Sequence, residues 1–187
     1  MHPFSRWFLV AALVVAAVAA FYDLRTRRIP LWLTWPALAA APMLHALAAY
    51  REHARGAFGL PGPALEGLLS LIGALACGIV PFAMERVGLM GGGDSKLLAS
   101  VGALLTVRTG VEVQLVALLL AGYFGLARLA FQGRLLATLG RSLASIANPF
   151  LPNHRRAAPP SALFESLPFA PFVLLGVLVS VLLTARL

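Results

Sequence analysis

Residues 7–24 read WFLVAALVVAAVAAFYDL, an unbroken apolar run that ends in a tyrosine and then an aspartate. A run of this length approaches the roughly 20 residues that an α-helix needs to cross the hydrocarbon core of a bilayer. Ionising a carboxylate in that core is costly, and acids close to membrane spans are therefore rare. The stretch predicts a membrane-spanning helix with an acidic group at one end.

The composition of the whole chain indicates the same class of protein. Of its 187 residues, 60% are hydrophobic and 12% are charged, with a mean hydropathy of +0.87. A soluble domain has about 45–50% apolar and about 25% charged residues. Strict alternation of apolar and polar residues, typical of a membrane barrel, is absent from the sequence. Helices are then the structures that satisfy the backbone in lipid.

The apolar residues fall into six segments, which together predict an all-α membrane protein with a bundle of about six transmembrane helices. We expect a single integral-membrane domain over residues 1–187. The fourth segment is short and reaches a full span only if the residues before Asp94 also lie within the bilayer. The segments are approximately 7–22, 31–49, 65–84, 96–107, 112–131 and 168–185.

The first segment also fits a second interpretation. Arg6, the apolar run and Ala17-Val18-Ala19 resemble a secretory signal peptide with a small-residue cleavage site. Tyr22-Asp23 and the basic turn that follows favour a retained span instead.

The net charge of +8 would suggest nucleic acid binding in a soluble protein. Here the basic residues lie in short loops, where they orient spans and meet anionic lipid head groups, so we expect lipid contacts and no nucleic acid partner. Placing the N-terminus outside puts most Lys and Arg residues on the inner side. This predicts a multi-pass protein of the cell inner membrane, with Asp23 and Asp94 both facing the cytoplasm.

The remaining sequence features predict no metal or redox site. The single cysteine, Cys77, lies in an apolar run and is expected to be a buried, inert thiol. No cysteine and histidine cluster has zinc spacing. Residues 132–167 are expected to hold an interfacial helix over Gly133–Ala147 and a loop rich in proline and arginine over Asn148–Pro160.

Two aspartates at the ends of apolar segments carry the candidate chemistry. Asp23 lies in FYDLRTRRIP, residues 21–30, and Asp94 lies in GLMGGGDSKLL, residues 88–98. The glycines before the second acid leave backbone exposed, so an extended peptide could lie against it. The positively charged Lys96 either helps to keep one carboxylate ionised or extends to the membrane surface from a helix end. The candidate site-shaping residues are therefore Gly91, Gly92, Gly93 and Lys96.

Two neighbouring carboxylates share a proton, because both cannot ionise readily. The ionised member can accept a proton from water while the protonated member donates one to a carbonyl or a leaving amine. That is aspartic-peptidase chemistry, and it requires no cofactor. A purely structural interpretation remains for each acid alone, since Asp94 could cap a helix and Asp23 could neutralise a neighbouring arginine. The two contexts together favour a catalytic pair.

These two stretches resemble the paired signatures of the type IV prepilin peptidases, within the wider class of GxGD membrane aspartyl proteases. Asp23 through Pro30 is similar to the family's aspartate, basic turn and Ile/Leu-Pro. Gly91–Asp94 with Lys96-Leu97-Leu98 is similar to its Gly-x-Gly-Asp and Lys-Leu-Leu. The stretch Leu167–Phe172, LPFAPF, is similar to a Pro-Phe-x-Pro-Phe sequence that opens the family's last helix. Leu31 and Ser95 depart from residues that are common in the family.

The resemblance implies Asp23 and Asp94 as the catalytic pair and a prepilin or pseudopilin as the substrate. Such a substrate keeps a basic leader in the cytoplasm and is cleaved after a glycine at the membrane boundary. Large family members carry a cysteine-containing cytoplasmic domain and also methylate the new N-terminus. Small Flp/Tad-type forms are the nearer likeness, so we expect cleavage without methylation. The sequence does not predict the oligomeric state.

Two other classes of function remain open from the residues. In a proton-coupled small transporter, Asp23 and Asp94 would form a proton relay. Such transporters usually show internal repeats with matched broken helices, and the two aspartate motifs here differ from each other. The chain could also be a non-catalytic assembly subunit of a secretion system.

Overall fold

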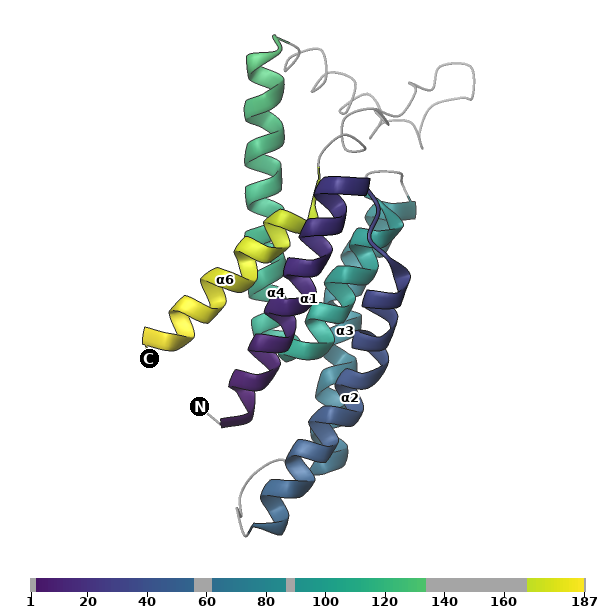
Figure 1. Cartoon of the computed structure of the whole chain (residues 1–187), viewed down its shortest axis with the longest axis vertical. Helices are drawn as coiled ribbons and strands as arrows, with labels where there is room; N and C mark the ends of the chain where they lie inside the picture. The colour runs from purple at the N-terminus through teal and green to yellow at the C-terminus, as the bar shows by residue number, and fades with distance from the viewer. Residues whose placement is uncertain (1–2, 56–61, 87–89, 134–167, 187) are drawn as a thin grey trace, which may run out of the picture.

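The computed structural model describes residues 3–55, 62–86, 90–133 and 168–186, and this part of the chain is helical with short turns and no strand. Four of its five helices are long and apolar enough to cross a membrane, which makes this a multi-pass membrane protein. The last helix holds a shorter apolar stretch, Ala170–Leu183. In chain order the helices are α1 (Pro3–Thr26), α2 (Leu31–Ala54), α3 (Pro63–Arg86), α4 (Gly92–Phe131) and α6 (Ala170–Arg186), as Figure 1 shows.

The helices coincide with the apolar segments expected from the sequence, with one difference. The fourth and fifth segments, expected as separate helices, lie in the single element α4. Its backbone leaves helical geometry at Thr106, where φ is 62° and ψ is −176°. This is a conformation that residues other than glycine rarely adopt, and it costs about 1–3 kcal/mol. The expected interfacial helix and loop of residues 132–167 lie almost entirely outside the described residues.

The chain folds back on itself at this break. In a straight helix Gly102 and Gly110 would be separated by about 12 Å along the axis. Instead, a Cβ built on Gly110 would lie 2.9 Å from the Cα of Gly102. The glycines therefore allow the two halves of α4 to touch. A Cβ on Gly73 of α3 would lie 2.3 Å from the carbonyl oxygen of Gly102, so α3 also packs closely against this turn.

Polar side chains from neighbouring helices bind the carbonyl groups just before the break. Ser70 of α3 donates a hydrogen bond of 2.7 Å to the carbonyl oxygen of Ala103. His45 of α2 lies 3.0 Å from the carbonyl oxygen of Leu104 through Nε2. Because a carbonyl only accepts, Nε2 carries the proton in this contact. These contacts satisfy backbone groups that a broken helix would otherwise leave unpaired in an apolar environment.

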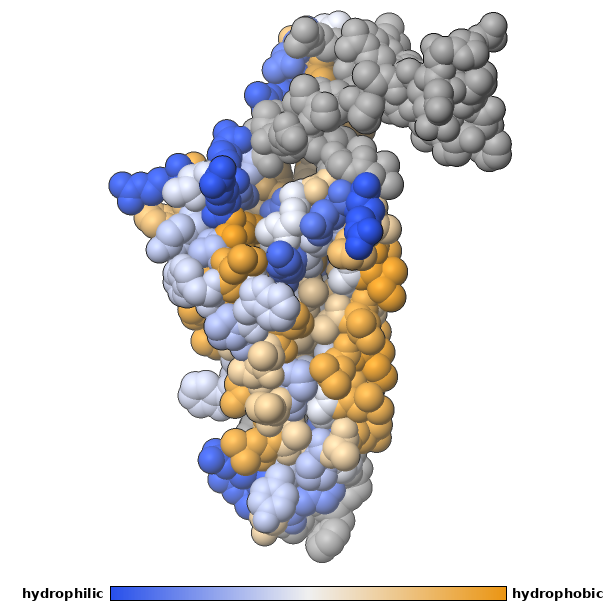
Figure 2. Space-filling model, turned by 90° about the vertical axis from the view of Figure 1, so that its right-hand side faces the viewer, coloured by the Kyte–Doolittle hydropathy of each residue, from blue (hydrophilic) through white to orange (hydrophobic). Residues whose placement is uncertain are grey.

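The outer surface suits contact with lipid. Figure 2 shows hydrophobic side chains along much of the viewed face, with hydrophilic ones gathered toward its two ends. Large apolar side chains are exposed on several helices, as a lipid-facing surface requires. They include Val10, Val14, Leu75, Ile79, Leu119 and Leu182.

The end of α1, the start of α4 and the start of α6 lie at the same end of the bundle, whereas both chain termini point toward the other end (Figure 1). The core between α1, α4 and α6 combines alanines and valines, such as Ala16, Val101 and Val173, with several leucines, such as Leu97. The helix α1 is thus an integral part of the packed bundle, which favours a retained span.

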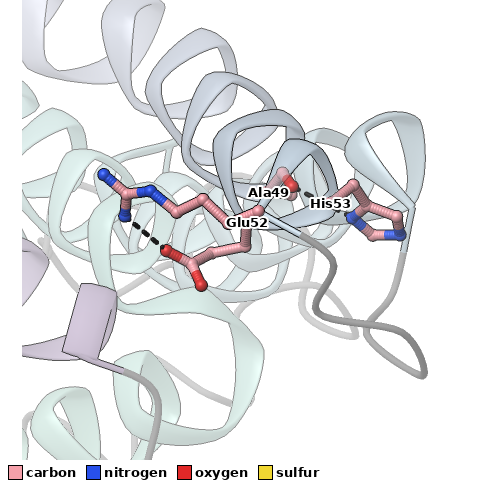
Figure 3. A network of polar contacts seen from close by, with 4 residues as sticks. Ala49, Glu52 and His53 are labelled. Carbon is pink, nitrogen blue, oxygen red and sulfur yellow. Dashed lines mark hydrogen bonds and ion pairs between the residues drawn. The ribbon is translucent and has the colours of Figure 1, made fainter.

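The far end of α2 carries a small polar cluster (Figure 3). Arg55 forms an ion pair of 3.0 Å with Glu52, and His53 Nδ1 lies 3.0 Å from the carbonyl oxygen of Ala49. These are contacts within a single helix end. They cap the last turn of α2 and lie away from the two aspartates.

Candidate active site

Asp23 lies in the last turn of α1, directly before a tight reversal of the chain. Arg27 adopts a left-handed conformation with φ of 55°, and its N–H donates to the carbonyl oxygen of Asp23 at 3.0 Å. Such a residue commonly ends a helix. Pro30 is the N-cap of α2 and has extended backbone, and Ile29 before it is restricted to extended backbone as well, so the new helix begins at Leu31. The basic turn that follows Asp23 therefore connects the end of α1 to the start of α2.

The carboxylate of Asp23 is almost completely buried, with 6% of the residue exposed. Its Oδ2 accepts a hydrogen bond of 3.0 Å from the backbone N–H of Ala170, the first residue of α6. The backbone of Phe169 and the charge of Arg27 also interact with this carboxylate. A buried acid far from the last helix in sequence is therefore held directly by that helix.

Asp94 lies in the first turn of α4 and is partly buried. It is close enough to Asp23 for the two carboxyl groups to interact electrostatically, and it also interacts with the backbone of Gly91. The structure therefore brings together the two acids that the sequence singled out. Their catalytic role remains a prediction.

The three glycines before Asp94 differ in what surrounds them. Gly91 is exposed and caps α4 with extended backbone, and a Cβ there would lie 3.0 Å from Oδ2 of Asp94. A Cβ on Gly92 would lie 2.6 Å from Oε1 of Glu85, at the end of α3. The other oxygen of Glu85, Oε2, accepts a hydrogen bond from the hydroxyl of Ser95. The side chain of Glu85 therefore contacts the first turn of α4. The sequence did not predict this contact.

Gly93 faces the basic turn. A Cβ at this position would lie 3.1 Å from the Cβ of Ile29 and 3.5 Å from its backbone nitrogen. The absence of a side chain lets the segment after Asp23 approach the segment that carries Asp94. This close approach is made by the chain itself, so the glycine motif has a structural role in addition to any contact with a substrate.

Lys96 is half-buried, and none of the ion pairs in the described residues involves it. Its predicted electrostatic role remains untested. Within the same described residues, no three His, Cys, Asp or Glu side chains lie close enough together to hold a metal ion.

The contact of Ala170 with Asp23 was also missed from the sequence. The LPFAPF stretch was expected to open the last helix, and α6 does begin within it, at Ala170. Its contribution to the aspartate site is a backbone N–H, a group that every residue except proline carries. Only the spatial arrangement of α1 and α6 could reveal that contribution.

These features define a class, a multi-pass helical membrane protein with two aspartates brought together at one end of the bundle. The sequence matches the type IV leader peptidase family over residues 8–126, well over half of the chain, and the protein belongs to that family. Membership implies aspartic-type cleavage of prepilin leader peptides. The matched residues include both aspartates and end before α6. A search of curated proteins and a search of solved structures gave no match.

Proposed function

We propose that the protein is an aspartic endopeptidase that removes the basic leader of pilin-like prepilins or pseudopilins by hydrolysis after a glycine. The observation that carries this proposal is that Asp23 and Asp94, from separate helices and separate motifs, lie near enough to interact electrostatically. Family membership favours a peptidase over a proton-coupled transporter or a non-catalytic assembly subunit.

The proposed reaction uses the pair as one acid–base unit. The ionised carboxylate accepts a proton from water while the water oxygen attacks the scissile carbonyl carbon. The protonated carboxyl donates its proton to the carbonyl oxygen, which gives a gem-diol. On collapse, the first group returns its proton to the amide nitrogen as the C–N bond breaks. The second group then accepts a proton from the diol, and both carboxyl groups regain their starting states.

The location of the pair supports a cleavage site at the membrane boundary. If the protein lies in the inner membrane with its N-terminus outside, the end of the bundle that holds Asp23 and Asp94 faces the cytoplasm. Counting the two halves of α4 separately gives six helical segments in the described part of the chain. The first half of α4 starts at that end of the bundle, and the chain turns back at Thr106. A substrate with an apolar helix in the bilayer and a basic leader in the cytoplasm would present its boundary at this end.

The glycine segment and Lys96 are proposed to shape the substrate site. Gly91 is exposed beside Asp94, where an extended substrate backbone could form hydrogen bonds with it. Lys96 follows Asp94 by two residues in α4, and its proposed role is to add a positive charge at this end of the bundle. We assign the chain to the small Flp/Tad-type form, with cleavage and no methylation, and its remaining partner is membrane lipid.

The test is cleavage of a defined substrate. The peptidase is co-expressed with a prepilin that carries a basic leader, a glycine and an apolar helix, and the N-terminus of the pilin is identified by mass spectrometry. We expect removal of the leader after the glycine. Asp23→Asn and Asp94→Asn enzymes should insert normally and leave the prepilin intact. Normal processing by a correctly inserted Asp94→Asn enzyme would exclude the proposed pair.

A further inference from the structure

At the start of α6, a proline in the second position reduces the number of backbone N–H groups that can donate hydrogen bonds. Pro171 carries no N–H group. The N–H groups of Phe172 and Val173 donate to the carbonyl oxygen of Phe169, at 3.0 and 3.4 Å. Among these first four residues of the helix, the N–H of Ala170 is therefore the one that remains for another partner. It donates to Oδ2 of Asp23.

The helix that carries this N–H is firmly held. Ala170, Val173 and Val177 are completely buried, and their spacing places them on one face of α6 toward the core shared with α1 and α4. A Cβ on Gly176 would lie 2.7 Å from the carbonyl oxygen of Val113, so the backbones of α6 and α4 are in close contact there. The donor therefore has a fixed position relative to both α1 and α4.

The surroundings make this one hydrogen bond important for Asp23. The acid is 6% exposed and Ala170 is fully buried, so bulk water cannot readily replace the donor. Hydrogen bonds to a charged group in a dry environment are stronger than those between neutral groups. The backbone of Phe169 forms a second, weaker contact with the carboxylate, and the charged groups that interact with it are Arg27, just after α1, and Asp94 in α4.

We propose that the backbone N–H of Ala170 positions the carboxylate of Asp23 for catalysis, so that α6 completes a site whose two acids both lie in the matched residues 8–126. This role deepens the proposed peptidase function and rests on it. Ala170 acts through Asp23 and is a positioning residue. It also gives Pro171 a function, because a proline at the second position leaves Ala170 as the one residue among the first four of α6 whose N–H is available to the acid.

The test removes this N–H and little else. Ala170→Pro eliminates the donor at the first position of a helix, where proline fits the backbone. Ala170→Gly retains the donor and removes the buried methyl group, which makes it the matched control. A third enzyme carries lactic acid in place of Ala170, so that an ester oxygen replaces the N–H without any change in side chain. Each purified enzyme is assayed with a purified prepilin in lipid nanodiscs, and kcat and KM are measured across pH.

We expect kcat to fall about 10- to 100-fold in the proline and ester enzymes, the range expected for loss of a hydrogen bond to a charged group. KM should remain near that of the parent, because the N–H contacts Asp23 and not the substrate. A donor favours the ionised form of its acceptor, so the acidic limb of the pH–activity profile should move to higher pH. Ala170→Gly should keep the parent profile.

Two results would overturn the inference. One is a folded ester enzyme with the kcat and pH profile of the parent. The other is a loss of kcat with an unmoved profile, which indicates general disturbance of the fold. If the proline enzyme fails to insert into the membrane, the result for the ester enzyme alone tests the role of the Ala170 N–H. Failure of the peptidase function itself would be distinguishable, because the parent enzyme would then leave the prepilin intact, and failure of the catalytic pair would appear as cleavage by Asp23→Asn at the parent rate.

Discussion

Gly93 offers the sharpest test of how the two aspartates are brought together. A Cβ at this position would lie 3.1 Å from the Cβ of Ile29. Optimal separation between carbon atoms is about 3.5–4.0 Å, so an alanine must push the two segments apart by about 0.4 Å or more. One of these segments follows Asp23 and the other carries Asp94. The substitution should therefore disturb the geometry of the pair.

Adding a group at such a packed position costs about 1–3 kcal/mol. If half or more of that cost is expressed as misplacement of the acids, kcat/KM falls about 3- to 100-fold, since 1.4 kcal/mol corresponds to a factor of about ten. Gly93→Val, with its additional methyl groups, should lose more activity than Gly93→Ala. The assay is prepilin cleavage by purified, correctly inserted enzyme.

Removing the partner of the clash should restore activity. Gly93→Ala with Ile29→Gly leaves the new Cβ facing a backbone nitrogen at 3.5 Å, an ordinary contact. We expect the double variant to be more active than Gly93→Ala alone. Gly122→Ala is the matched control, because a Cβ there meets nothing within 4 Å. If Gly93→Ala is as active as the parent, or if the Ile29→Gly change gives no recovery, the turn does not set the position of the pair.

Four further predictions follow from the same structure. The double variant Asp23→Asn with Asp94→Asn should lose no more turnover than either single variant, because the acids act as one unit; multiplicative losses would contradict this. A reporter fused after Arg28 should be cytoplasmic and one fused near His53 should be external, and the reverse pattern would exclude the proposed orientation. Gly102→Ala should lower the thermal stability of the purified protein far more than the Gly122→Ala control, because its Cβ would lie 2.4 Å from a carbonyl oxygen of α3. Finally, labelled S-adenosylmethionine should leave the mature pilin unlabelled, because the sequence contains no glycine-rich nucleotide-binding turn; enzyme-dependent label on the pilin N-terminus would refute this.

The sequence predicted the helices because lipid allows few alternatives. Long apolar runs must be helical when no water is present to satisfy the backbone, and α1, α2 and α3 accordingly match the expected segments. The break in α4 was harder to place. The sequence suggested a gap after residue 107, but the structure bends at Thr106, a β-branched residue with no local signal for positive φ. Ser70 and His45 bind carbonyl groups just before the bend, and only tertiary packing supplies these contacts.

The site was predictable to the extent that its chemistry depends on rare side chains. Asp23 and Asp94 stood out because acids are uncommon in membrane spans. The groups that hold them were not predictable in the same way. Ala170 acts through its backbone, and Ile29 acts through its shape. Neither residue type carries information about such a role until the fold places it beside a particular neighbour.

The groups that hold the two aspartates also explain how a small helical bundle can keep two carboxylates close together. Bringing like charges into proximity is unfavourable, and at Asp23 the positive charge of Arg27 offsets part of this cost. Backbone contacts also hold the acids in place. One is bound by the start of α6, and the other lies in the first turn of α4, whose glycines let Glu85 and Ile29 approach. The three helix ends therefore act as one unit, and a change at any of them should be transmitted to the pair.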